Sequence, residues 1–391
     1  MANTSRQFEA FAKKRGLGFL IVCGGKEDKV EVDASVRRVT LRRSSFGFPL
    51  DKNHQFDLAF WRHYDQVLAE VRQFAPDIVH ITGPSDVGQL GTLIAHRLSI
   101  PLAASWHTNL HEYAERRASP LFSFLSRSAQ QKTGALIRDA SLALILQFYN
   151  LADVLFAPNV ALIDLLAKGV NKPVHSMRRG VDATLFSPEK RQRQNAQFTI
   201  GYIGRLTVEK NVRLLAEIEG ALLRSGFSDF RFSIVGQGAE AAWLKSSMKH
   251  ADVEGPFQGE ALARAYANLD AFVFPSRTDT FGNVVLEALA SGVPAIVSDA
   301  GGPRFIVRSG ETGFVAHDSG EFVSHILRLA AEPQLLHTMR QSARAYALNL
   351  SWERIFDGMC GDYEKELRSS ALMRKNPRRR PQPSVVSSRL S

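Results

Sequence analysis

The residues best suited to bind phosphate and sugar lie in the segment Pro275–Pro294, which reads PSRTDTFGNVVLEALASGVP. This order predicts a strand end, a tight turn and then a helix that begins near Gly282 and Asn283. The free backbone N–H groups at a helix start favour a diphosphate. Glu287 follows one turn later on the same helix face, and Asp279 lies in the preceding turn. We therefore expect Glu287 to accept ribose hydroxyls and Asp279 to reach sugar hydroxyls.

Two cations follow a predicted strand at Phe198–Ile203. Gly204 would let the backbone approach a ligand closely. Arg205 can bind phosphate oxygens with its planar guanidinium, and Lys210 adds a second charge five residues later. Together they can stabilise negative charge on a departing nucleoside diphosphate, a task that a metal ion otherwise performs. The alternative is a pair of solvated cations at a helix start, where positive charge is mildly unfavourable.

His107 follows another predicted strand, Leu102–Ser105. A single histidine is more often structural than catalytic. This one comes at the carboxyl end of a strand, where the active-site residues of open α/β sheets collect. We expect His107 to take a direct part in the site, and we do not assign it as a general base.

The elements that must position these residues alternate between short apolar strands and amphipathic helices. This pattern predicts parallel sheets with helices on both faces. A chain of 391 residues suits two such cores, and the polar stretch Pro188–Gln197 would link them. The other predicted strands are Phe19–Val22, Ile78–Thr82, Val154–Ala157, Phe230–Val235, Ala271–Phe274 and Ala295–Ser298.

The first predicted element is a helix, Ser5–Lys14, whereas a Rossmann half normally opens with a strand and a glycine-rich turn. The first strand of the N-terminal domain is therefore expected to be missing from this sequence. Either the start codon is placed too far downstream, which we favour, or the domain lacks that strand.

Composition narrows the class of protein. The net charge of +10 includes six basic residues in 371–391, so the rest of the chain carries +4. That proline- and serine-containing tail predicts disorder. Two distant cysteines give neither a disulfide framework nor a zinc site and suit the cytosol. The basic charge comes with no nucleic-acid-binding motif, so we expect no nucleic-acid partner.

These motifs resemble glycosyltransferase family 4, the group 1 glycosyltransferases, over roughly Ile78 to Tyr363. The resemblance implies the α/β fold called GT-B, in which two Rossmann-like doubly wound domains face a central cleft. It implies an acceptor-side domain at 1–188 and a donor-binding domain at 189–345. A helix at 346–370 would cross back to the first domain, ahead of the basic tail at 371–391.

The same resemblance implies roles for single residues. Arg205 and Lys210 hold the donor diphosphate, Asp279 and Glu287 hold the donor sugar and ribose, and His107 faces the transferred sugar. Asp279 stands where the family usually has Glu, which puts the donor-sugar preference in doubt. The remaining donor-binding residues would be Gly204, Gln258 along the nucleobase, Phe281, Gly282 and Asn283. We expect neither a metal nor another cofactor.

The implied reaction moves a hexosyl group from a UDP- or GDP-hexose to a lipid, glycan or small-molecule acceptor, with retention of configuration. Two alternatives stay open: a non-catalytic or weakly active binding protein, because of the missing strand, and a nucleotide-sugar epimerase of the same fold. The stretch 114–148 mixes cations with apolar residues. It predicts either peripheral contact with an anionic membrane on its cytoplasmic face or a solvated helix.

Overall fold

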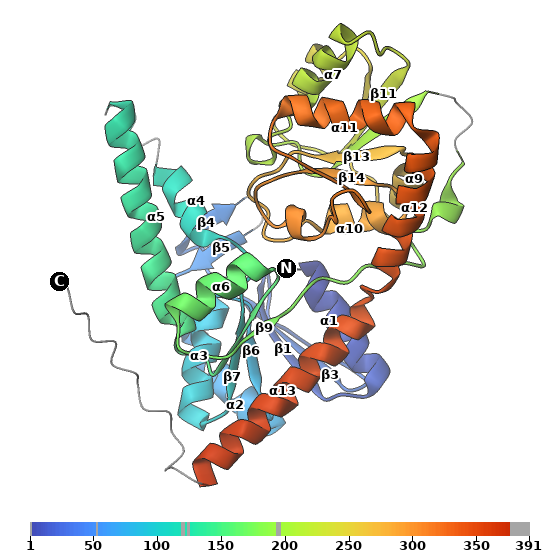
Figure 1. Cartoon of the computed structure of the whole chain (residues 1–391). Helices are drawn as coiled ribbons and strands as arrows, with labels where there is room; N and C mark the ends of the chain where they lie inside the picture. Colours follow the sequence, from blue (N-terminus) through green and yellow to red (C-terminus); the bar gives the residue numbers. More distant parts are fainter. Residues whose placement is uncertain (1, 52–53, 119–121, 123–125, 193–196, 376–391) are drawn as a thin grey trace, which may run out of the picture.

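The computed structural model describes residues 2–51, 54–118, 122, 126–192 and 197–375, which form two α/β lobes (Figure 1). The second lobe contains one parallel sheet in the order β12-β11-β10-β13-β14-β15. The order reverses between β10 and β13, and ligands of doubly wound sheets bind at such a point. Its strands are β10 (Phe198–Ile203), β11 (Phe230–Val235), β12 (Ala251–Glu254), β13 (Ala271–Phe274), β14 (Ala295–Ser298) and β15 (Gly313–Ala316).

Helices cover both faces of this sheet (Figure 1). Helices α7 and α11 contact each other on one face, and α10 packs against α12 and α9 on the other. The enclosed strands β13 and β14 are buried along their whole length, in one continuous core. The helices of the lobe are α7 (Leu214–Arg224), α8 (Ala241–Ser247), α9 (Gly259–Ala267), α10 (Asn283–Ala290), α11 (Ser319–Ala331) and α12 (Pro333–Leu348).

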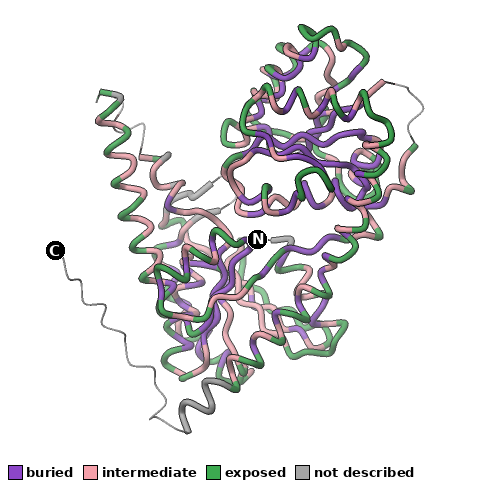
Figure 2. The backbone as a smooth tube through the Cα atoms, viewed as in Figure 1, coloured by how far each residue is buried: buried purple, intermediate pink, exposed green. Residues whose placement is uncertain are grey.

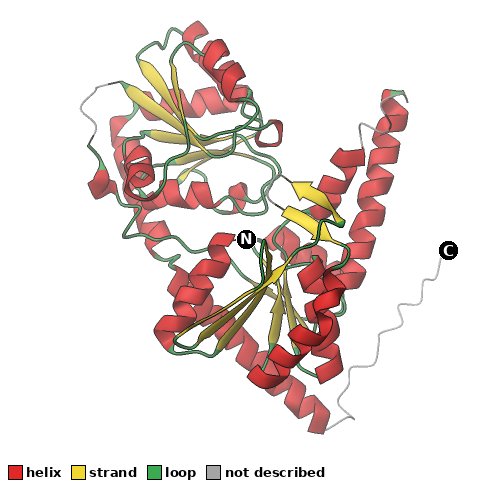
Figure 3. Cartoon of the chain, turned by 180° about the vertical axis from the view of Figure 1, so that it is seen from behind, coloured by secondary structure: helices red, strands yellow, loops and turns green. Residues whose placement is uncertain are grey.

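The strands of the first lobe fall into separate sheets (Figure 3). One is parallel, in the order β6-β7-β8-β9. The second, β1-β3-β2, pairs β1 parallel and β2 antiparallel to β3, while β4 and β5 form a hairpin. The strands are β1 (Phe19–Gly25), β2 (Lys29–Asp33), β3 (Val36–Arg42), β4 (Gly47–Asp51), β5 (His54–Asp57), β6 (Val79–Ile81), β7 (Leu102–Ser105), β8 (Val154–Ala157) and β9 (Val174–Ser176).

One helix joins the two larger sheets. α3 contacts both β6 and β1, although no hydrogen bonds pair β1 with β6 among the described strands. Every residue of β1 is half-buried, in contrast to the fully buried β7 and β8. The helices of this lobe are α1 (Ala2–Arg15), α2 (Tyr64–Phe74), α3 (Asp86–Leu98), α4 (Leu110–Ala118), α5 (Arg127–Tyr149) and α6 (Val160–Gly169).

The last helix, α13 (Trp352–Lys375), runs back along the first lobe and packs against α1 (Figure 1). The Phe8 and Phe11 rings lie 4.7 and 5.5 Å from the ring of Phe356, centroid to centroid. The helix continues past residue 370, where the sequence predicted its end. Residues 376–391 of the predicted tail lie outside the described residues.

The N-terminal part of α5 projects from the lobe and has many exposed residues, whereas its C-terminal part packs on the core of the first lobe (Figures 1 and 2). It contacts α4 alongside. Leu136 and Leu144 are 70% and 66% exposed on α5. Among the described residues, no helix combines the length and the apolar character needed to cross a bilayer.

Candidate active site

The turn and helix predicted to hold a diphosphate form at the carboxyl end of β13. Gly282 caps α10 at its N-terminus with φ 97°. A Cβ atom there would approach Pro303 Cγ to 2.9 Å, so the position favours glycine both by conformation and by space. Asn283 is the first helical residue and is half-buried. The free N–H groups of α10 therefore lie at the point where the sheet order reverses.

Lys210 and Asp279 meet directly at this edge. Lys210 ends a short 3₁₀ turn, Val208–Lys210, after β10, and its Nζ lies 2.5 Å from Asp279 Oδ1. Thr278 Oγ1 donates to the Glu209 carbonyl at 3.2 Å, which holds the two loops together. The other carboxylate oxygen, Asp279 Oδ2, is buried and has no hydrogen-bond partner. Asp279 Oδ2 can thus accept a hydrogen bond from a ligand, next to the ammonium group of Lys210.

Arg205 lies in the same loop but behaves differently from Lys210. Arg205 is exposed, and its backbone carbonyl accepts a 2.9 Å hydrogen bond from the Tyr202 hydroxyl. Gly204 comes close to the next loop along the sheet, because a Cβ atom on Gly236 would lie 1.9 Å from the Gly204 carbonyl oxygen. The side chain of Arg205 is therefore left at the surface of a tightly packed loop.

Glu287 lies on α10 beyond the turn and accepts a 2.9 Å hydrogen bond from the Tyr266 hydroxyl through Oε2. Burial raises the pKa of Glu287 to about 7, although the hydrogen bond from Tyr266 opposes this rise. Oε1 is left for another donor. The carboxyl group is thus well placed for hydroxyls, but its charge varies near neutral pH.

The remaining residues predicted to bind the donor differ in how far their side chains are exposed. The side chain of Phe281 is buried in the core of the second lobe, so a ligand can meet only its backbone. Gln258 is exposed and precedes α9, after the edge strand β12. It lies at the same end of the sheet as the α10 turn, because both follow parallel strands.

His107 belongs to a chain of buried hydrogen bonds in the first lobe. Its Nε2 lies 2.6 Å from Ser105 Oγ, which lies 2.8 Å from His80 Nε2. His80 Nδ1 contacts the Tyr363 hydroxyl of α13, and His107 Nδ1 contacts Arg179 Nη2. Burial and the charge of Arg179 lower the pKa of His107 well below its usual value, so the ring is neutral.

The donors fix the direction of this chain. Arginine can only donate, so His107 Nδ1 accepts and its Nε2 carries the proton. His107 then donates to Ser105, Ser105 donates to His80, and His80 donates to Tyr363. Both nitrogens of His107 therefore make hydrogen bonds within the protein.

The two lobes touch at Thr280, in the turn before α10. Thr280 Oγ1 donates to the His107 backbone carbonyl at 2.9 Å, and the Thr280 carbonyl accepts from Asn159 Nδ2 at 2.7 Å. Asn159 also caps α6 through its side chain. The predicted sites of the two lobes, His107 and the Asp279 turn, are thus adjacent.

Sequence reasoning missed several residues of this arrangement, among them His80 and Tyr363 of the hydrogen-bond chain, and also Tyr266 and Thr280. Tyr266 looks like an apolar position of α9, and only the fold brings its hydroxyl to Glu287. Thr280 looks like a turn residue, and its contact is with a residue 173 positions away. No local sequence signal identifies either contact.

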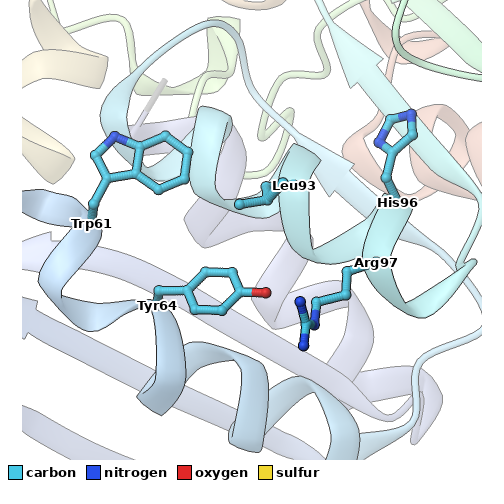
Figure 4. A pocket seen from close by; sticks show the side chains of 5 residues that line it. All are labelled: Trp61, Tyr64, Leu93, His96 and Arg97. Atoms are coloured by element: carbon cyan, nitrogen blue, oxygen red, sulfur yellow. The ribbon is translucent and has the colours of Figure 1, made fainter.

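An open hollow of about 680 Å³ lies elsewhere, on the outer helices of the first lobe (Figure 4). None of the predicted site residues lines it. Its lining consists of Trp61, Tyr64, Leu93, His96 and Arg97. Among the described residues, no group of three or more His, Cys, Asp or Glu side chains is arranged to hold a metal ion.

Comparison with known proteins identifies the family of the chain. Glycosyltransferase Family 4 matches residues 6–185, and Glycosyl transferases group 1 matches residues 197–332. The chain is similar to the GDP-mannose-dependent alpha-mannosyltransferase of Mycobacterium tuberculosis, with 34% identity over 76% of this chain and 75% of that protein. A protein of the same name from Mycolicibacterium smegmatis is 32% identical over 78% of each chain.

The fold is also found among solved structures. Sucrose-phosphate synthase from Thermosynechococcus elongatus superposes with a TM-score of 0.69 at 19% identity, covering 93% of both chains. This likeness supports the GT-B architecture of two Rossmann-like domains. With two family matches along the chain and close relatives that span most of it, the protein belongs to the family 4, group 1 glycosyltransferases and is a hexosyltransferase that uses a nucleotide-sugar donor.

Proposed function

We propose that the protein transfers mannose from GDP-mannose to an acceptor held by the first lobe, with retention of configuration. One observation carries the proposal: Lys210, Asp279 and the N-terminus of α10 meet where the second sheet reverses its order. Cations and free N–H groups at such a point suit a diphosphate. The donor identity rests on the relatives that use GDP-mannose.

In this proposal Lys210 and Asp279 form their ion pair in the unliganded protein, before the donor binds. A diphosphate offers Lys210 more negative charge than one carboxylate, and Arg205 lies exposed in the same loop to join it. Asp279 Oδ2 has no partner in the protein and can accept from a sugar hydroxyl. Glu287 Oε1 can accept from the ribose beside Tyr266.

The chemical step then depends on the leaving group. Lys210 and Arg205 stabilise the charge that develops on the nucleoside diphosphate as the sugar–phosphate bond breaks. His107 is neutral and hydrogen-bonded through both nitrogens, so it does not take the acceptor proton. We assign that proton to a phosphate oxygen of the leaving group, on the face where the acceptor attacks, which retains configuration.

The test is to incubate the purified protein with GDP-mannose and, separately, with UDP-glucose, GDP-glucose and UDP-glucuronate. We expect nucleoside diphosphate release to be fastest with GDP-mannose and unchanged by EDTA, because protein cations replace a metal. NMR of the product anomeric centre checks retention. An inverted product, no release from any donor, or release of an epimerised nucleotide sugar would contradict the proposal.

We further propose that α5 rests on an anionic membrane where a lipid acceptor is available. Lys132, Leu136, Ala140 and Leu144 recur every four residues, and all four are exposed, so they share one face. An apolar stripe with a cation at one end suits a bilayer interface. Leu121, Phe124 and Leu125 of the predicted stretch lie outside the described residues.

This surface can be tested with vesicles. We expect the protein to float with phosphatidylglycerol vesicles but not with phosphatidylcholine vesicles, and Leu136→Glu with Leu144→Glu to abolish flotation. Leu223→Glu, an exposed leucine on α7 of the second lobe, is the matched control. Equal flotation by the double variant would contradict membrane contact through α5.

A further inference from the structure

A buried cation lies beside His107 with part of its hydrogen-bonding capacity unused. Arg179 follows β9 in the segment that leads to the second lobe, and it is 5% exposed. Its neighbour Arg178 is exposed. The chain thus directs one of two consecutive arginines into the protein and the other into solvent.

Arg179 has fewer partners than a buried guanidinium needs. Nη2 donates to His107 Nδ1, but Nη1 is buried without a hydrogen-bond partner. Among the described residues, no carboxylate forms an ion pair with Arg179. Burial lowers the pKa of Arg179 to about 10, which leaves it charged at neutral pH. An unpaired buried charge is costly to the fold, and this cost is recovered only when an anion arrives.

Arg179 lies next to the contact between the two lobes. The histidine that Arg179 contacts is joined through its carbonyl to Thr280 of the second lobe. Asp279, the neighbour of Thr280, carries the unpartnered acceptor proposed for the donor sugar. Lys210 neutralises the charge of Asp279 within the second lobe, whereas Arg179 has no carboxylate partner among the described residues.

We propose that Arg179 is a second anion-binding group beside the contact between the lobes, separate from Arg205 and Lys210, and that it binds a phosphate or carboxylate carried by a substrate. The location of the substrates rests on the proposed function; the binding of an anion does not. Two sources share this chemistry: the donor diphosphate, and an acidic group on the acceptor. A planar guanidinium can hold either through two oxygens.

The test measures binding by calorimetry in phosphate-free buffer at low salt. The probes are inorganic phosphate, D-glucuronate, D-glucose as the neutral match, and GDP. Arg179→Gln removes the charge but can still donate to His107, and Arg178→Gln is the matched control at the exposed neighbour. Arg179→Lys tests whether a point charge suffices.

We expect the wild type and Arg178→Gln to bind at least one anionic probe, and Arg179→Gln to bind it at least about tenfold more weakly, as for a lost buried bond to a charged group. Weaker binding of GDP by Arg179→Gln identifies the donor diphosphate as the source. Binding of glucuronate to GDP-saturated wild type, lost in Arg179→Gln, identifies an acidic acceptor.

Stability separates this role from a purely structural one. Without ligand, Arg179→Gln is expected to melt at or above the wild-type temperature, because an uncompensated charge is removed. Anion affinities equal to those of the wild type, or no preference of the wild type for any anion over glucose, would overturn the proposal. GDP binding by Lys210→Ala tests the donor site independently, so failure of the proposed function is seen separately.

Discussion

The two lobes have related folds but differ in how their cores are built. The second lobe has one six-stranded parallel sheet around one continuous core, and the residues predicted to bind the donor lie along one edge of that sheet. The first lobe has two larger sheets with separate clusters of buried residues, and it depends on α13 from the end of the chain. The proposed donor site thus lies in a lobe with a single core, whereas the proposed acceptor side is held together by distant segments.

The largest effect that we expect is a loss of stability when the packing of α13 on the first lobe is disrupted. Phe356→Ala removes a fully buried ring that packs on Phe8 and Phe11, and we expect a loss of about 3–5 kcal/mol in the free energy of unfolding. Urea denaturation measures this loss. GDP affinity of the folded variant should stay within about twofold, because the donor site lies in the other lobe.

Arg354→Ala, on an exposed turn of the same helix, is the control for this change, and we expect an effect within about 0.5 kcal/mol. If folded Phe356→Ala no longer bound GDP, the second lobe would not be the self-sufficient half that the comparison describes.

Lys210→Ala tests the proposed donor site in the second lobe. Transfer is expected to slow by at least about 100-fold, since removal of one preorganised charge stabiliser costs about this much. The variant is also expected to lose stability, because Asp279 loses its ion-pair partner, so the rates are compared at a temperature at which both proteins are folded. Steady-state rates with GDP-mannose measure the loss, with Lys245→Ala on the exposed side of α8 as control. A change of less than about threefold would remove Lys210 from the mechanism.

Glu287→Gln tests the carboxyl group whose pKa burial raises to about 7. If the ionised form binds the ribose, wild-type GDP affinity falls as the pH drops from 8 to 6. The variant should bind about tenfold more weakly at pH 8, without this pH dependence. Calorimetric titration at several pH values gives both results, and a parallel pH dependence in Glu287→Gln would assign the titration to another group.

The raised pKa of Glu287 also fixes the direction in which the stability of the unliganded protein changes with pH. Between pH 4.5 and about 7 the folded state holds a proton on Glu287 that the unfolded state has lost, so the wild type loses stability as the pH rises through this window. At pH 8 we expect Glu287→Gln to be the more stable protein by thermal unfolding.

The smallest effect concerns the contact between the lobes. Thr280→Val keeps the shape of the side chain but removes its hydrogen bond to the His107 carbonyl. The cost is about 1 kcal/mol, or roughly fivefold in kcat/KM, with GDP affinity unchanged. Thr338→Val, which removes a similar bond within α12, is the control. An effect on GDP affinity alone would place Thr280 within the donor site.

The same contrast explains what the sequence could reveal. Strands β10, β11, β13 and β14 of the second lobe and β7 and β8 of the first were predicted with correct bounds, because each is a short apolar run. Strands β2 to β5 and β9 of the first lobe were missed, as were β12 and β15 of the second. The exposed β2 and the three-residue β9 lack a buried pattern that would distinguish them.

At the site, sequence analysis identified residues that follow the ends of neighbouring strands. It missed residues that come together only through tertiary packing. Lys210 and Asp279 were predicted for one ligand, and the structure pairs them directly. Phe281 was predicted to bind the donor, whereas its ring is buried in the core. Contacts such as Tyr266 with Glu287 depend on tertiary packing, which a local pattern does not encode.

The unpaired side of β1 has a practical consequence. This strand, FLIVCGG, is apolar and parallel to β3 on one side, and its other side has no strand partner among the described residues. Natural sheets protect such borders with charges, prolines or bulges, and none of these occurs within β1. Any self-association through strand pairing is therefore expected to use this side of β1.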